Sequence, residues 1–288
     1  MYPSEKSTWG RQRLFAIEFY SPLTDGYLHQ LRSCGSYTNI AGNHREKGML
    51  MMKWIEAESY EEMSKIAADI FISQIGENDK SVIGLATGGT PEGFYKELVE
   101  NYKSGKISFV GTTSFNLDEY VGISVESEAS YHYYMKKHLF SHIDTKSENI
   151  HIPNGDSKNL EEAAKEYDLQ IQEAGGIDIQ LLGIGVNGHI GFNEPGSSFE
   201  KGTQVVELTE STREANRIYF DRLEDVPTHA ITMGIKTIMQ SKKVVLLISG
   251  ASKQEAYDRL RAGQVTEDFP ASVLHLHDDV TVIYTGVS

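Results

Sequence analysis

Hydrophobic residues follow two different periods along the chain from Met52 onward. Residues 81–86 form an almost continuous apolar run, which is typical of a strand buried on both faces of a sheet. Residues 60–75 place their apolar side chains on one helical face, and Ser59 with Glu62 three residues later has the spacing of a capping box. The pattern therefore predicts an amphipathic helix followed by a buried strand.

The same alternation continues through the rest of the chain. It predicts further strands at 53–56, 112–117, 177–184, 244–249 and 280–284, and further helices at 91–102, 130–142, 160–174 and 253–262. Strands and helices that alternate at this spacing favour a parallel sheet with helices on both faces. No interior change of composition marks a second domain, so we predict a single α/β domain over residues 52–288.

Residues 1–51 show neither period. They carry six Lys or Arg against four Asp or Glu, whereas the rest of the chain carries 21 against 37. We expect this segment to be a disordered N-terminal extension or an artefact of an upstream start codon. The competing hypothesis is that its aromatic and aliphatic residues dock as a lid or an oligomer contact, namely Phe15, Phe19, Tyr20 and Leu23.

The composition narrows the class of protein. The single cysteine, Cys34, cannot form an internal disulfide, which fits a reducing compartment such as the cytoplasm and excludes a zinc site built from cysteines. No run of 18 apolar residues is present and the first residues lack the pattern of a secretory signal, so we expect no membrane span. The net charge of −14 argues against a nucleic-acid partner, but a local site can still bind a phosphorylated substrate.

Ligands of parallel α/β sheets bind beyond the carboxyl ends of the strands, so the residues that follow each strand are the candidates for function. Thr87, Gly88, Gly89 and Thr90 follow the strand at 81–86 and precede a helix. Paired glycines let backbone N–H groups approach an anion, and the helix N-terminus adds partial positive charge. This turn is a candidate phosphate cradle, and a plain tight turn is the alternative.

Two adjacent carboxylates, Asp118 and Glu119, follow the strand at 112–117. Neither is easily buried without a partner. In a cleft, one carboxyl group of such a pair can acquire a pKa that suits proton abstraction. The alternative is a solvated start of the next helix.

The strand at 177–184 leads into a loop with candidate acid–base residues. Its glycines at 183, 185 and 188 match the dinucleotide-binding fingerprint, but that fingerprint opens an apolar helix and this stretch continues into polar residues and glycines. We therefore expect a catalytic loop in which His189 transfers protons near neutral pH and Glu194 orients it or balances its charge. A metal site is the weaker alternative, because no HxH or HExxH partner lies near His189.

Five stretches of the chain together resemble the glucosamine-6-phosphate deaminase family, also called the glucosamine-6-phosphate isomerase family. They occur in the order and at the spacing of that family, at residues 84–91, 116–120, 130–132, 182–195 and 268–272. The loop GHIGFNEP at 188–195 is highly specific for it. The resemblance covers Met52 to the C-terminus and does not extend into residues 1–51.

The resemblance implies a modified Rossmann-like α/β domain and an amino-sugar catabolic enzyme, active in N-acetylglucosamine degradation. It would convert glucosamine 6-phosphate and water to fructose 6-phosphate and ammonium, without a metal or cofactor. By resemblance, His189 opens the sugar ring with Asn187 and Glu194 positioning it, and Asp118 moves a proton from C2 to C1. The implied phosphate-binding residues are Thr87, Gly88, Gly89, Thr90, Arg217 and Lys253. The implied partner is a small sugar phosphate, with no nucleic acid or membrane, and self-association stays open.

The chain departs from the family's pattern at several positions. Some relatives carry aspartate where Asn187 stands, so the carboxylate relay to the histidine is either weakened or rests on Glu194 alone. The family's phosphate arginine lies two residues after an Ala-Asn pair, whereas Arg217 follows that pair directly here, and Arg213 is the alternative. The strand expected at 202–207 lacks the basic residues of relatives that an acetylated amino-sugar phosphate regulates, and their C-terminal tail is missing, so we expect no allosteric activation.

Two other functions stay open. A 6-phosphogluconolactonase-like hydrolase has a similar fold, but it usually shows a basic residue after the acidic pair and a different sequence after the Gly-His pair. A sugar-phosphate sensor that binds without reacting would carry a helix-turn-helix module, and residues 1–51 are too irregular and too weakly basic for one. Release of ammonium from glucosamine 6-phosphate discriminates the three functions.

Overall fold

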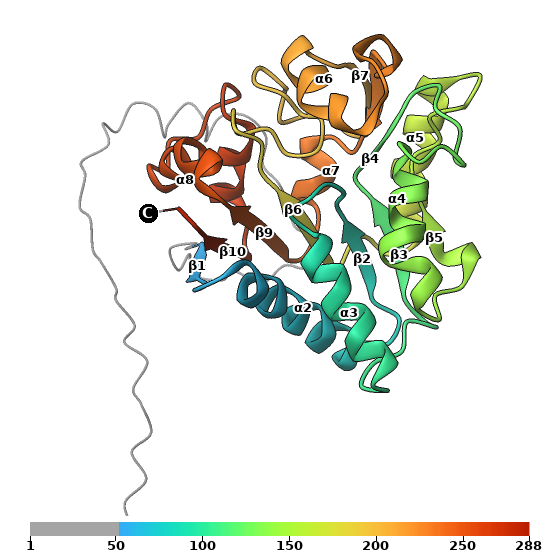
Figure 1. The fold of residues 1–288 in the computed structure, drawn as a ribbon, viewed down its shortest axis with the longest axis vertical. Helices are drawn as coiled ribbons and strands as arrows, with labels where there is room; N and C mark the ends of the chain where they lie inside the picture. The colour runs from blue at the N-terminus through green and yellow to red at the C-terminus, as the bar shows by residue number, and fades with distance from the viewer. Residues whose placement is uncertain (1–51, 288) are drawn as a thin grey trace, which may run out of the picture. The chain divides into compact units, whose positions relative to one another are not determined.

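The computed structural model describes residues 52–287, so the predictions for residues 1–51 fall outside the described residues. The described chain forms a sheet of seven strands in the order β1-β10-β9-β6-β2-β3-β5, and every neighbouring pair runs parallel. Its strands are β1 (Lys53–Glu56), β2 (Val82–Leu85), β3 (Thr113–Asn116), β5 (Ile150–His151), β6 (Ile179–Gly183), β9 (Val244–Ser249) and β10 (Val280–Thr285). The predicted parallel sheet is confirmed (Figure 1).

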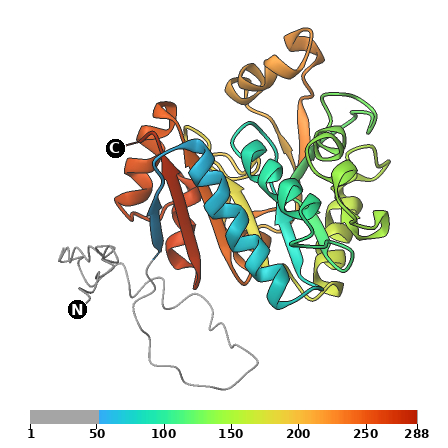
Figure 2. The same cartoon turned by 60° about the horizontal axis from the view of Figure 1, so that its bottom comes forward.

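Helices cover both faces of this sheet, as predicted. Helices α2 and α3 lie side by side on one face, and α7 lies on the other (Figures 1 and 2). The α-helices are α2 (Tyr60–Glu77), α3 (Glu92–Lys103), α4 (Tyr131–His138), α5 (Leu160–Glu173), α6 (Glu210–Asn216), α7 (Ile235–Met239) and α8 (Gln254–Arg261). Short 3-10 helices are η1 (Phe140–His142), η2 (Ser147–Asn149), η3 (Arg217–Tyr219), η4 (Leu223–Asp225), η5 (Ala251–Lys253) and η6 (Pro270–Leu276). Within residues 52–287, every helix is too short or too polar to cross a bilayer.

A second, antiparallel sheet was not predicted. It consists of three strands in the order β4-β8-β7, with β4 at Asp118–Tyr120, β7 at Gln204–Glu207 and β8 at His229–Thr232. The predicted strand at 112–117 ends at Asn116, and the chain passes through Leu117 into β4. Strand β4 escapes sequence analysis because it has three residues, two of them acidic, and no alternating pattern.

The predicted capping box at the start of α2 is present in a modified form. The Ser59 side chain accepts a hydrogen bond from the backbone N–H of Glu62 at 3.2 Å. The Glu62 carboxylate in turn accepts the backbone N–H of Glu58 at 2.7 Å, one residue before the expected partner. The first bond satisfies a donor that a helix start otherwise leaves unpaired, and the second ties the preceding residue to the first turn.

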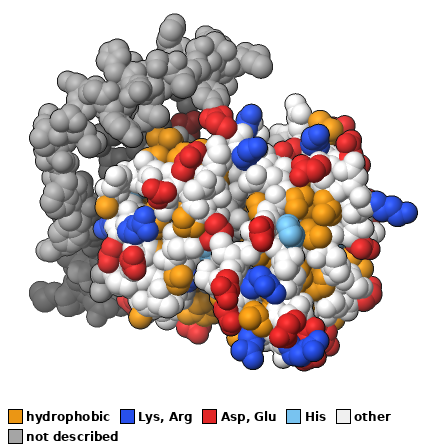
Figure 3. All heavy atoms as spheres, turned by 90° about the horizontal axis from the view of Figure 1, so that it is seen from above, with side chains coloured by type: hydrophobic (Ala, Val, Ile, Leu, Met, Phe, Trp, Pro, Cys, Tyr) orange, Lys and Arg blue, Asp and Glu red, His pale blue; other side chains and the backbone are white. Residues whose placement is uncertain are grey.

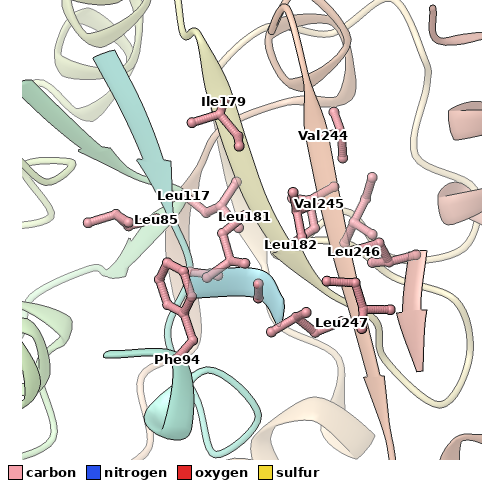
Figure 4. Packing of buried hydrophobic residues seen from close by; sticks show 14 of the residues in the cluster. Leu85, Phe94, Leu117, Ile179, Leu181, Leu182, Val244, Val245, Leu246 and Leu247 are labelled. Atoms are coloured by element: carbon pink, nitrogen blue, oxygen red, sulfur yellow. The ribbon is translucent and has the colours of Figure 1, made fainter. Parts of the chain in front are cut away.

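The core lies between the central strands and the helices (Figure 4). Leu182 of β6 pairs in register with Leu246 of β9, and both side chains are fully buried. Phe94 of α3 is also fully buried and closes the core from the helical side. Burial of one such side chain stabilises a fold by about 1.5–3 kcal/mol, so the apolar runs read from the sequence are also the strands that hold the sheet together.

The strand order reverses direction between β2 and β6. After β2 the chain continues to β3 and β5 on one side, and it then returns to place β6 on the other side of β2. Loops that leave two neighbouring strands in opposite directions open a crevice at their carboxyl ends. The Gly88-Gly89 turn follows β2 and the His189 loop follows β6, so the topology brings these two candidate segments together.

Candidate active site

A cavity of about 390 Å³ lies at the carboxyl ends of β9, β6, β2 and β3. It is lined by eight of the ten residues proposed from the sequence, namely Thr87, Gly88, Gly89, Thr90, Asp118, Asn187, His189 and Lys253. Glu194 lies behind this surface and reaches the cavity through hydrogen bonds to Asn187 and to Thr212 of α6. Arg217 is not among the lining residues.

The turn after β2 is held in place by two tyrosines that sequence analysis missed. The hydroxyl of Tyr134 donates to the carbonyl of Gly88 at 2.6 Å, and the hydroxyl of Tyr60 lies 3.1 Å and 3.0 Å from the carbonyls of Gly89 and Thr90. Gly88 adopts a positive φ of 107°, which favours glycine. With its carbonyls bound to α2 and α4, the turn keeps a fixed shape at the cavity wall.

The backbone donors of this turn are available to a ligand. Across the described residues, the N–H groups of Gly88, Gly89 and Thr90 donate to no protein acceptor. They precede α3, whose N-terminus adds partial positive charge. This arrangement suits a phosphate group, and it agrees with the cradle interpretation of the sequence.

Lys253 supplies a cation to the same cavity. It ends η5, directly after β9 and the positive-φ residue Gly250. Burial lowers the pKa of its ammonium group. Within residues 52–287 it forms no ion pair, so its charge is available to an anionic ligand.

The two candidate arginines are placed differently from Lys253. Arg217 lies at the end of α6 with an exposed side chain. Arg213 is bound to the protein itself, because its Nη2 donates to the carbonyls of Leu223 at 3.0 Å and Val226 at 3.1 Å. Ile218, which is 78% exposed, lines the cavity next to Arg217. The structure thus gives Arg213 a structural role, and a phosphate contact by Arg217 stays a prediction.

The acidic pair at the start of β4 divides into two roles. Asp118 is 6% exposed and faces the cavity. Burial, reinforced by the nearby negative charge of Glu119, raises the pKa of Asp118 to about 8. Among the described residues no donor binds its side chain, so its carboxyl group is free to act on a ligand.

Glu119 points away from the cavity and secures helix α4. Its carboxylate accepts the backbone N–H groups of Tyr131 and His132, both at 3.1 Å, and it lies 2.9 Å from Nδ1 of His132. A carboxylate at a helix N-terminus is stabilised by the helix dipole. The sequence alone could not assign these two roles, because they depend on the direction in which β4 turns its side chains.

His189 is oriented by a relay of hydrogen bonds. The Oδ1 atom of Asn187 accepts the backbone N–H of His189 at 3.2 Å and lies 2.8 Å from its Nδ1. An oxygen at this position requires Nδ1 to carry a proton, so Nε2 is left to accept or return a proton. The Nδ2 of Asn187 donates to Oε2 of Glu194 at 2.7 Å, and Nδ1 of His189 lies 3.6 Å from the same oxygen.

Glu194 remains ionised in this relay. Burial alone would raise its pKa, but hydrogen bonds from His189, Thr212 and Asn187 outweigh burial and lower the pKa to about 2. A carboxylate in this position stabilises a positive charge on His189. The neutral Asn187 therefore does not isolate the histidine from negative charge, since Glu194 is within reach of the ring.

The glycines that mimic a dinucleotide fingerprint serve close packing. A Cβ atom on Gly185 would lie 2.2 Å from Cε1 of His189, and one on Gly188 would lie 2.1 Å from the ring of Phe269. The carbonyl of Gly188 also accepts the N–H of Ala271 at 2.9 Å. No helix begins in this loop, so the stretch lacks the structure of a dinucleotide-binding fingerprint, and its catalytic role stays a prediction.

Two histidines one residue apart, His275 and His277, each lie against a backbone carbonyl. Nε2 of His275 lies 2.7 Å from the carbonyl of Leu260, and Nε2 of His277 lies 2.7 Å from the carbonyl of Ser241. In the part of the chain that the structure describes, no three His, Cys, Asp or Glu side chains gather as a metal site.

Seen from the side of α6 and β7, acidic and basic side chains are interspersed rather than gathered into patches (Figure 3).

Comparison with known proteins shows which proteins the chain resembles. A family model described as "Glucosamine-6-phosphate isomerases/6-phosphogluconolactonase" matches residues 56–283. The chain is 56% identical over 237 residues to a glucosamine-6-phosphate deaminase of Lysinibacillus sphaericus, covering 82% of this chain and 100% of the relative. It is 52% identical over 232 residues to glucosamine-6-phosphate deaminase 1 of Bacillus subtilis, covering 81% and 96%.

Solved structures show the same fold. A structure described as a monomeric glucosamine-6-phosphate deaminase matches with a TM-score of 0.80 and 52% identity, over 81% of this chain and 97% of that chain. A 6-phosphogluconolactonase from Thermotoga maritima matches with a TM-score of 0.65 and 22% identity, over 82% and 100%. The second likeness concerns the fold alone.

Proposed function

The chain belongs to the glucosamine-6-phosphate isomerase/6-phosphogluconolactonase family, and on this premise we propose that it is a glucosamine-6-phosphate deaminase. It converts glucosamine 6-phosphate and water to fructose 6-phosphate and ammonium. The observation that carries the proposal is that the Asp118 carboxyl group and the His189 relay face one cavity, beside the Lys253 cation and backbone N–H groups that donate to no described protein acceptor. When the phosphate of the substrate binds at the Gly88-Gly89 turn, Asp118 and His189 are the two acid–base groups that can act on its carbon atoms.

The phosphate is held first. The N–H groups of Gly88, Gly89 and Thr90 bind its oxygens, and Lys253 supplies the opposite charge. Hydrogen bonds between a charged group and such donors are about twice as strong as neutral ones. A substrate held by its phosphate has its reacting carbons placed against Asp118 and His189, which lowers the entropy cost of the later steps.

His189 then opens the pyranose ring. Nε2, the nitrogen that the Asn187 bond leaves free, moves a proton between the anomeric hydroxyl and the ring oxygen. Glu194 stabilises the positive charge that the imidazole carries in between. The product of this step is the open-chain aldehyde.

Asp118 carries out the isomerisation. Its carboxylate removes the proton from C2, which gives an enolamine with its double bond between C1 and C2. Return of the proton to C1 gives an iminium ion at C2. Water adds to C2 and the C–N bond breaks, so that the ketone and ammonium are formed. A single carboxylate can remove and return the proton on one face of the substrate.

The experiment measures ammonium and fructose 6-phosphate released from glucosamine 6-phosphate by the full chain. Both products should form in equal amounts, and Asp118→Asn should lower turnover by about 10²–10⁴-fold while substrate still binds. Hydrolysis of 6-phosphogluconolactone in place of ammonium release would assign the chain to the other branch of its family. Binding of glucosamine 6-phosphate without turnover would favour a sensor.

The proposed setting is the breakdown of amino sugars, including N-acetylglucosamine, in the cytoplasm. The single Cys34 fits a reducing compartment. The implied partner is the sugar phosphate itself, with no nucleic acid, membrane or metal. The related structure described as monomeric makes a single chain the simplest active form.

A further inference from the structure

Thr212 connects helix α6 to the histidine relay. Its side chain is 7% exposed, and its hydroxyl donates to Oε1 of Glu194, the oxygen that Asn187 does not use. The Oγ1 of Thr209 donates to the Oγ1 of Thr212 at 3.0 Å, which directs the hydroxyl proton of Thr212 toward Glu194. A continuous file of hydrogen bonds therefore runs from the start of α6 through Glu194 to His189.

The same helix forms part of the cavity wall. Ser211, Ala215 and Asn216 line the cavity within about one helical turn of Thr212. On its outer side α6 is fixed by Arg213, which donates to the carbonyls of Leu223 and Val226. The position of α6 therefore determines both the shape of the cavity and the orientation of the Glu194 carboxylate.

We propose that Thr212 is a positioning residue for ring opening, which acts on His189 through Glu194 and Asn187. The inference rests on the proposed function. Without the hydroxyl of Thr212, Oε1 of Glu194 loses the donor that holds its plane. The carboxylate can then rotate, and the imidazole that depends on it loses its alignment with the ring oxygen. A misplacement of about 1 Å costs about 10²-fold in rate.

Two pairs of variants separate the hydroxyl from the packing. Thr212→Val keeps the volume and removes the hydroxyl, whereas Thr212→Ser keeps the hydroxyl and removes a methyl group. We expect Thr212→Val to lower kcat about 10–100-fold with a KM within about threefold of wild type, and Thr212→Ser to retain at least about a third of kcat. Thr212→Ala compared with Thr212→Ser differs by one oxygen atom and gives the same test if Thr212→Val does not fold.

Thr237 offers a matched control. It is 5% exposed and its hydroxyl donates to Oδ1 of Asp168 at 2.9 Å, away from the cavity. Thr237→Val removes a similarly buried hydroxyl that also donates to a carboxyl oxygen. We expect Thr237→Val to lower the melting temperature as Thr212→Val does and to leave kcat unchanged.

A second substrate locates the affected step. An analogue of glucosamine 6-phosphate that lacks both the C4 and the C5 hydroxyl can close neither a furanose nor a pyranose ring, so it stays in the open form. We expect Thr212→Val to react with it at nearly the wild-type rate, and His189→Gln to show the same pattern. Wild-type kcat in Thr212→Val, an equal loss in Thr212→Ser, or an equal loss on both substrates would each overturn the proposal. Absence of ammonium release by the wild-type protein would instead overturn the proposed function.

Discussion

The ionisation of Asp118 should control the dependence of the reaction on pH. The carboxyl group is 6% exposed and its pKa is raised to about 8, whereas the base is active only as the carboxylate. About half of the free enzyme carries the carboxylate at pH 8, and about 1% carries it at pH 6. We therefore expect kcat/KM to fall about 50-fold when the pH is lowered from 8 to 6.

The bound substrate should shift the acid limb of the pH profile, the range in which the rate falls as the pH is lowered. The ammonium group at C2 lies next to the proton that Asp118 removes, and an opposite charge nearby lowers the pKa of a carboxyl group. We therefore expect the acid limb of kcat to lie at lower pH than that of kcat/KM. Initial rates of ammonium release between pH 5.5 and 9 give both profiles. A kcat/KM that stays constant from pH 6 to 8 would refute the buried, protonated state of Asp118.

The pH dependence of stability gives an independent measure of the pKa of Asp118. Because the folded pKa is raised above the unfolded value near 3.9, ionisation of Asp118 destabilises the fold as the pH rises from about 4 to 8. Asp118→Asn removes this charge, so its melting temperature relative to wild type should increase over that range and level off above pH 8. A difference that does not change with pH would show that the wild-type carboxyl group titrates normally.

Three further predictions concern other parts of the chain. Gly185→Ala should lower kcat/KM at least about 10²-fold with the fold retained, since its Cβ would lie 2.2 Å from the His189 ring; steady-state kinetics and circular dichroism check this. Lys253→Gln should raise KM about tenfold or more and leave kcat within about threefold, and an unchanged KM would remove Lys253 from the phosphate site. A protein that begins at Met52 should keep the melting temperature and turnover of the full chain, and a large drop in either would make residues 1–51 part of the working structure.

The sequence predicted the parts of the fold that depend on burial. The strands β2, β6, β9 and β10 are mostly apolar and almost wholly buried, and a strand buried on both faces needs such a composition whatever surrounds it. The antiparallel sheet was missed because β4 begins with two acidic residues whose burial depends on partners from α4 and the cavity. Tertiary contacts, which a local pattern does not contain, decide such elements.

In the candidate site, too, the local sequence predicts some features, whereas tertiary contacts decide others. The polar residues at strand ends pointed to the cavity, because the carboxyl ends of adjacent parallel strands meet at one edge. The separate roles of Asp118 and Glu119 could not be read from the sequence, since both are carboxylates in adjacent positions. Tyr60 and Tyr134 were missed for a related reason, because a tyrosine on an amphipathic helix is indistinguishable from a core residue until its hydroxyl finds a partner.

Two separate sets of hydrogen bonds support the cavity, and different helices provide them. The cradle is held by tyrosines of α2 and α4, whereas the His189 relay is held through Glu194 by α6. A change in the first support moves the phosphate in the ground state and the transition state alike, so it alters mainly KM. A change in the hydrogen bonds that orient His189 affects the proton transfer and not the binding of the phosphate, so it alters mainly kcat. We therefore expect Tyr134→Phe to raise KM several-fold at nearly constant kcat, the reverse of Thr212→Val. A loss of kcat in Tyr134→Phe as large as in Thr212→Val would show that the two supports are coupled.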